Sequence, residues 1–79
     1  MHINEAIRQQ VCIQCSDIKQ RDEVVKVLEA NEVTKDFIFE DSGLFIEMYG
    51  ILREYTIGAN PLPSTDKIIT ATDFLNSNK

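Results

Sequence analysis

The stretch that decides the fold runs from Val11 to Asn31 and reads VCIQCSDIKQRDEVVKVLEAN. In its first part apolar residues recur at every second position, as a half-buried strand requires: Val11, Ile13 and Cys15. In its last part they follow helical spacing: Val24, Val25, Val27 and Leu28. The sequence therefore predicts a strand that leads directly into a helix.

Capping signals place this helix at about residues 17–32. Ser16 or Asp17 is a favoured N-cap residue type, and Gln20, three positions after Asp17, gives the spacing of a capping box. Asn31 is a residue type that ends helices. Acidic side chains recur along the same helix. Its buried face is predicted to consist of Ile18, Val24, Val25, Val27 and Leu28.

Further strands are predicted between residues 37 and 57. Phe37–Glu40 and Leu44–Tyr49 flank Asp41–Gly43, a polar turn ending in glycine that favours a tight hairpin. Leu44–Tyr49 carries apolar residues on both faces. Gly50 is either the pivot of a second turn or a bulge, because glycine takes the backbone angles that both require. We favour the turn, followed by a strand at Ile51–Ile57.

The two ends of the chain give weaker patterns. Gly58–Ser64 holds two prolines and is expected to be a loop. Lys67–Ile69 then predicts a short edge strand, and Thr70–Asp73 has the capping pattern of a last helical turn through Phe74 and Leu75. We expect Asn76–Lys79 to fray. Residues 1–10 form either a short amphipathic helix or an irregular lead into the first strand.

This order of elements indicates an α+β fold, a two-layer sandwich with one main helix on a mostly antiparallel sheet of four or five strands. One helix covers only one face of such a sheet. Apolar residues on the other face are then exposed, covered by the N-terminal segment, or buried against another molecule. This surplus is the observation that points to a partner.

Length and charge limit the classes of function. The 79 residues form one domain, because a chain of this length supports a single core. Thirteen acidic and eight basic residues leave a net charge of -5, which argues against direct nucleic-acid binding and allows a basic protein partner. No signal peptide or membrane-length apolar run is found, so we expect a cytoplasmic protein with reduced cysteines.

Cys12 and Cys15 form a C-x-x-C pattern just before the predicted helix, where redox dithiols occur. In a strand their Cα atoms would be roughly 10 Å apart, beyond the ~7 Å that a disulfide tolerates. They would also point to opposite faces, Cys15 toward the core. We interpret both as small buried hydrophobic residues and keep a C-x-x-C thiol or metal-binding protein as the alternative.

Other catalytic arrangements are not found, so we expect no enzyme activity, no cofactor and no metal. Besides the cysteines, only His2 and carboxylates could bind zinc. Glu47 and Glu54 would be cross-strand neighbours if Gly50 turns the chain, with Arg53 nearby, but a solvated sheet face explains them. The glycines do not form a phosphate-binding loop.

The strand entering an acidic helix, the FIFE and LFIEMY segments and the tail IITATDFL resemble the short accessory proteins encoded by tailed phages and prophages. The resemblance extends from Val11 to Leu75. It implies a non-enzymatic protein that binds a host protein stoichiometrically in the host cytoplasm, for example an inhibitor of a defence system such as an anti-CRISPR or antirestriction protein. No functional residue is transferred by it.

The predicted partner-binding surface combines the acidic helix with the sheet face. Its residues are Asp22, Glu23, Glu29, Phe45, Glu47, Tyr49, Glu54 and Tyr55. The expected partner is a host protein, which could be a basic, nucleic-acid-binding one. A domain that associates with itself as a homodimer is a further alternative, because a chain of this size is only marginally stable alone.

Overall fold

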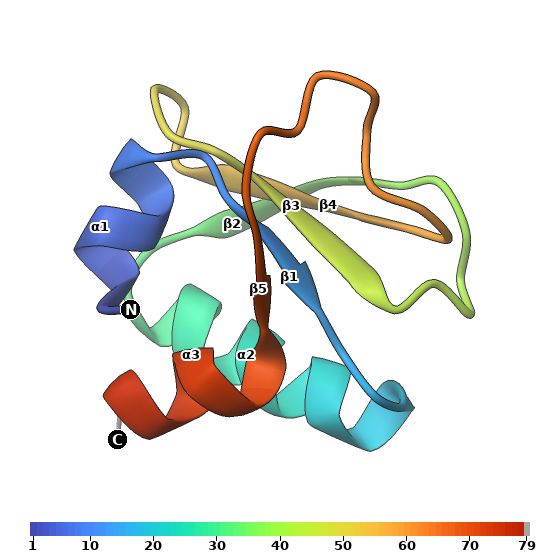
Figure 1. Ribbon diagram of the computed structural model, residues 1–79, viewed down its shortest axis with the longest axis horizontal. Coiled ribbons are helices and arrows are strands. Elements are labelled where there is room, and N and C mark those ends of the chain that lie inside the picture. Colours follow the sequence, from blue (N-terminus) through green and yellow to red (C-terminus); the bar gives the residue numbers. More distant parts are fainter. Residues whose placement is uncertain (79) are drawn as a thin grey trace.

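The computed structural model describes residues 1–78. One layer is a five-stranded sheet with strand order β2-β4-β3-β1-β5, and the other layer is formed by helices (Figure 1). The helices are α1 (Ile3–Arg8), α2 (Ile18–Ala30) and α3 (Ala71–Ser77). The strands are β1 (Cys12–Gln14), β2 (Thr34–Ile38), β3 (Phe45–Tyr49), β4 (Glu54–Gly58) and β5 (Ile68–Thr70). The predicted α+β class is confirmed.

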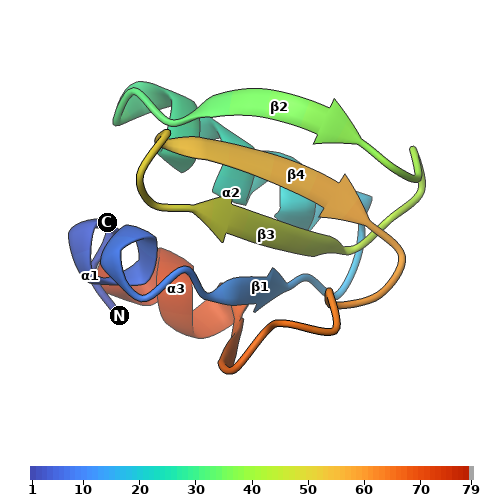
Figure 2. The same ribbon diagram turned by 90° about the horizontal axis from the view of Figure 1, so that it is seen from above.

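The sheet is mixed, which corrects the expectation of a mostly antiparallel one. β3 runs antiparallel to both of its neighbours, β1 and β4, whereas β5 is parallel to β1 and β2 is parallel to β4. The β2–β4 pair is parallel because α2 carries the chain from β1 to the far edge of the sheet, where β2 lies (Figure 2). After β4, residues 59–67 return the chain to the opposite edge, so that β5 runs parallel to β1. β3 and β4 then fill the space between β1 and β2.

The predicted hairpin between Phe37–Glu40 and Leu44–Tyr49 is therefore wrong. β2 begins earlier, at Thr34, and pairs with β4 instead of β3. Gly43 does not form a hairpin turn. It allows the backbone to pass close to Gly58, because a Cβ atom at position 43 would lie 2.4 Å from the backbone oxygen of Gly58. The chain after β2 thus passes the end of β4 before it enters β3.

The turn favoured at Gly50 is confirmed, because Tyr49 and Glu54 are directly paired across residues 50–53. β4 consequently starts at Glu54, later than the predicted strand. Gly50 also packs against the first helix, and a Cβ atom there would lie 2.4 Å from the backbone oxygen of Ile7. The close approach explains why a glycine occupies this position.

Helix α2 has the predicted caps. The Asp17 side chain accepts a hydrogen bond of 2.7 Å from the Gln20 backbone N–H, and Asn31 is the C-cap. Val24 and Leu28 are fully buried. Ile18 is 41% exposed, so its place in the predicted buried face is wrong. Because Ile18 lies six residues before Val24, its side chain points about 120° away from that of Val24 around the helix.

The core lies between the inner face of the sheet and the helices. Strand register aligns Ile13, Ile46 and Ile57 in one row across β1, β3 and β4. All three are buried in a cluster with Leu28 of α2 and Phe74 of α3. Side chains therefore alternate along β3 as predicted, and Ile46 and Met48 point toward the core.

The two ends of the described chain pack on each other. α1 forms, which is the first of the two alternatives for residues 1–10. α3 extends to Ser77, so the expected fraying is wrong for Asn76–Asn78; Lys79 lies outside the described residues. The reason is that the Asn78 side chain accepts a hydrogen bond from the Ile3 N–H and donates to the carbonyl of Met1.

Candidate functional site

The candidate functional surface is the face of the sheet that points away from the helices, called here the outer face (Figure 1). Register places Cys12, Glu47, Thr56 and Phe37 in one row across it, from β1 to β2. Strand alternation adds Phe39, Phe45, Tyr49 and Glu54 to the same face. The apolar surplus expected on this face therefore exists.

A loop covers one half of the outer face. Residues 59–67 fold back over β3, and the Glu47 carboxylate accepts hydrogen bonds from the Leu62 backbone N–H at 2.9 Å and from the Thr65 hydroxyl. Beneath this loop Glu47 and Cys12 are buried, with 6% and 0% exposure. A loop of the same chain covers this half of the face. From the sequence, only the N-terminal segment or another molecule is expected as the cover.

The other half of the outer face is open. Phe37 and Phe39 are 55% and 60% exposed, and their rings meet edge to face with centroids 4.9 Å apart. Gly58 of β4 lies between Phe39 and the half-buried Phe45 and places no side chain there. We call Phe37, Phe39, Phe45 and Gly58 the aromatic patch.

Acidic residues are neighbours of the aromatic patch in the chain and in the sheet. Asp36 and Glu40 flank the two exposed phenylalanines in the chain, and Asp41 follows in the loop. Glu54 lies on the outer face in the next row, opposite Tyr49. Two cations adjoin the same segments: Lys35 on β2, and Arg21, whose guanidinium donates hydrogen bonds to the backbone oxygens of Asp41 and Gly43. The patch thus has an apolar centre and a mainly negative rim, which suits an apolar contact bordered by positive charge.

The structure separates the residues predicted as a partner surface. Phe45, Tyr49 and Glu54 share the outer face, as expected. Asp22, Glu23 and Glu29 are exposed on α2, which lies on the opposite side of the sheet. These two groups do not form one continuous surface.

Two of the predicted contact residues lie in the interior. Tyr55 is 2% exposed on the inner face, where its hydroxyl donates a 3.1 Å hydrogen bond to Glu29 of α2. Glu47 is held under the loop and pairs with Thr56, so it is not the cross-strand neighbour of Glu54. Neither side chain presents a surface to another molecule in this conformation.

Phe37 and Phe39 were not among the residues predicted to bind a partner, although a signal existed. The sequence Phe37-Ile38-Phe39 alternates one inward aliphatic residue with two outward aromatic ones. The hairpin prediction paired this segment with Leu44–Tyr49, whereas the structure places it at the edge of the sheet beside β4. At the edge, only β4 flanks it.

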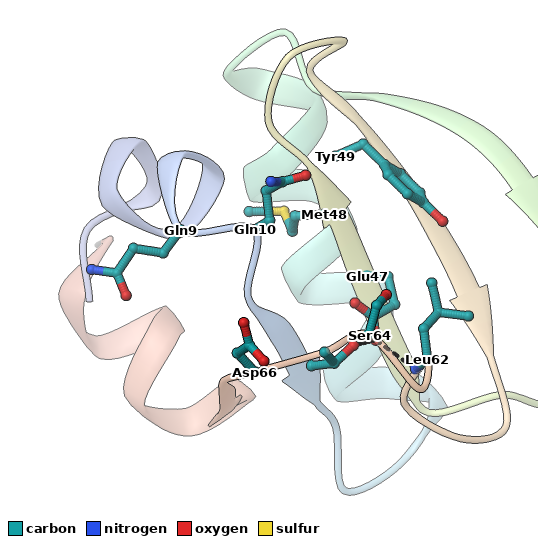
Figure 3. Close-up of a pocket in the computed structure, with 9 residues that line it drawn as sticks. Gln9, Gln10, Glu47, Met48, Tyr49, Leu62, Ser64 and Asp66 are labelled. Atoms are coloured by element: carbon teal, nitrogen blue, oxygen red, sulfur yellow. Dashed lines mark hydrogen bonds between the residues drawn. The ribbon is translucent and has the colours of Figure 1, made fainter.

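A pocket of about 240 Å³ lies beside the loop, between β3 and the end of α1. Its lining is mainly polar, with amides from Gln9 and Gln10 and carboxylates from Glu47 and Asp66 (Figure 3). The Glu47 carboxylate already binds the loop. Among residues 1–78, no three His, Cys, Asp or Glu side chains gather as metal ligands. We assign no chemistry to this pocket.

The two cysteines are free, buried and on opposite sides of β1. Burial raises the pKa of Cys15 to about 11. Burial and then the charge of Glu47 raise the pKa of Cys12 well above its usual range. Both thiols are therefore protonated at neutral pH, whereas redox and metal chemistry need the thiolate. This environment argues against the C-x-x-C alternative.

Comparison of the chain with protein-family models, curated proteins and solved structures found no match. No helix within residues 1–78 combines the length and the apolar character needed to cross a bilayer.

Proposed function

We propose that the protein is a non-enzymatic binding module that docks another protein on the open half of its outer face. The observation that carries this proposal is the exposure of Phe37 and Phe39. The fold buries neither ring, yet exposed aromatic pairs on a sheet are typical anchors of protein interfaces. Burying them against a partner would contribute the apolar driving force of binding.

The charge of the surface indicates what the partner looks like. Asp36, Glu40 and Glu54 lie around the aromatic patch, and the whole chain carries a net charge of -5. A partner with an apolar site bordered by Lys or Arg would be complementary, and the opposite charges would speed its association. Self-association through the patch is the competing hypothesis, but it would bring two acidic rims together.

The resemblance to phage and prophage accessory proteins leads us to propose a more specific role. The partner would be a host protein with a basic, nucleic-acid-binding surface, and the protein would inhibit it by occupying that surface in the host cytoplasm. Inhibition of a defence system, of the anti-CRISPR or antirestriction type, is one form of this role. It requires no turnover and no cofactor.

The test begins with affinity capture from host cells and continues with titration of the purified partner. The variant Phe37→Ser/Phe39→Ser removes the exposed rings. Gly58→Lys adds bulk and positive charge between Phe39 and Phe45 without a backbone clash. Ile68→Ser is the matched control, because Ile68 is 49% exposed on the opposite edge strand. We expect both patch variants to lose binding, the control to retain it, and added salt to weaken the wild-type complex. Equal affinity of all four proteins would contradict the proposal.

A further inference from the structure

The turn between β3 and β4 displays two large apolar side chains. Ile51 is 94% exposed and Leu52 is 68% exposed, more than any other large hydrophobic residue described in residues 1–78. The turn projects from one end of the sheet, as the yellow loop at the upper left of Figure 1. Polar residues would form this turn equally well, so the fold itself does not explain why Ile51 and Leu52 are apolar.

The turn is held firmly in place. The Arg53 guanidinium donates a 2.6 Å hydrogen bond to the backbone oxygen of Asn31, and the Thr34 N–H donates to the backbone oxygen of Arg53 at 3.0 Å. Arg53 adopts a φ of 51°, a strained conformation for a residue with a side chain. On the other side, Gly50 packs against the backbone of Ile7. The two apolar side chains are thus presented on a preorganised support, which reduces the entropy lost on binding.

The charges near the turn favour a protein over a lipid surface. Turns that insert into membranes are accompanied by Lys or Arg that contact anionic headgroups. Here the guanidinium of Arg53 is directed to Asn31, and the neighbouring Glu32 and Glu54 are acidic. A projecting tip of two aliphatic residues with acidic neighbours fits an apolar socket with basic groups at its mouth.

We propose that Ile51 and Leu52 form a second anchor, which inserts into an apolar socket on the same basic protein that docks on the aromatic patch. The inference rests on the proposed function, because it assigns a further contact to the same partner. β4 connects the two anchors, with the turn before Glu54 and the patch at Gly58. Its five residues span roughly 17 Å. The partner's two apolar sites must therefore lie about this far apart.

The test uses a benzophenone amino acid, p-benzoylphenylalanine, placed at Leu52 in one chain and at Phe37 in another. Illumination in host cells is followed by identification of the cross-linked protein and its purification. That protein is titrated with the wild type, Ile51→Ser/Leu52→Ser, Phe37→Ser/Phe39→Ser and the control Ile18→Ser, whose exposed side chain lies on α2. Thermal unfolding of each variant checks that the fold is unchanged.

We expect one protein to be cross-linked from both positions. Ile51→Ser/Leu52→Ser should weaken its binding by at least about tenfold, while Ile18→Ser leaves binding unchanged. Cross-linking from position 37 alone, with normal affinity of the turn variant, would overturn the second anchor and leave the proposed function in place. Absence of cross-linking from both positions would contradict both.

A lipid surface is tested in parallel with vesicles of phosphatidylcholine and phosphatidylglycerol. The inference expects the wild-type protein to remain in the supernatant when the vesicles are sedimented. Sedimentation of the wild type that is lost in Ile51→Ser/Leu52→Ser would overturn the protein socket.

Discussion

Glu47 of β3 accepts a 2.9 Å hydrogen bond from the backbone N–H of Leu62, which ties the loop after β4 to the outer face of the sheet. The same carboxylate oxygen accepts the hydroxyl hydrogen of Thr65. One buried side chain therefore anchors this loop at two positions, Leu62 and Thr65.

Replacing Glu47 with Ala should destabilise the protein by about 1–3 kcal/mol, because two donors lose their acceptor in a partly buried site. Glu47→Gln keeps an acceptor oxygen and should cost less. Equilibrium unfolding in urea measures both, with the exposed helix residue in Glu23→Ala as control. Equal stability of Glu47→Ala and Glu23→Ala would show that the loop is held by other contacts.

The clasp between the chain ends gives a second prediction. Asn78 bonds to the N–H of Ile3 and to the carbonyls of Met1 and Phe74. Asn78→Ala should lower the free energy of unfolding by about 1–3 kcal/mol, since each lost hydrogen bond is worth about 1 kcal/mol. Asn76→Ala, at an exposed position of α3, is the control. A thermal midpoint of Asn78→Ala that matches the control would refute the clasp.

Glycine substitutions test the close approaches in the turns. Gly50→Ala would force a Cβ atom to 2.4 Å from the backbone of Ile7, whereas at Gly58 the nearest atom is 3.7 Å away. We expect Gly50→Ala to cost about 1–3 kcal/mol and Gly58→Ala to be close to neutral. Urea unfolding of the pair checks this, and a stable Gly50→Ala would mean that α1 does not pack against the turn.

The buried thiols predict how stability changes with pH. The folded pKa of Cys15 is about 11, above its ordinary value of 9.0, and that of Cys12 is also raised. Stability is therefore fully present below about pH 9 and falls as pH rises toward 11, because the unfolded chain releases its protons first. Unfolding free energies across this range should fall less steeply for Cys12→Ala/Cys15→Ala. The same slope in both proteins would show that the thiols are not responsible.

Local patterns predicted those parts of the fold that depend on neighbouring residues. The caps at Asp17 and Thr70, the strand-to-helix change of period and the turn at Gly50 are all set by side chains within a few positions of one another. The pairing of β2 with β4 is a long-range choice. It is accompanied by the close packing of Gly43 on Gly58, which no local pattern in the sequence reveals.

The sequence predicted apolar residues on the outer face of the sheet, but it predicted only some of the residues that lie there. Alternation along β3 placed Phe45 and Tyr49 on the outer face. The inward turn of Tyr55 followed from the register of β4, which starts at Glu54 because the preceding turn takes residues 50–53. The loop over Glu47 depends on a contact between positions 47 and 62, which no local spacing reveals.

The most direct test of the account is the hydrogen-exchange footprint of the complex with the captured partner. If the outer face is the docking surface, backbone amides of β2 and of the following Phe39–Gly43 segment should exchange more slowly in the complex, while those of α2 remain unchanged. Protection confined to α2, around Asp22 and Glu23, with none in β2 would contradict it.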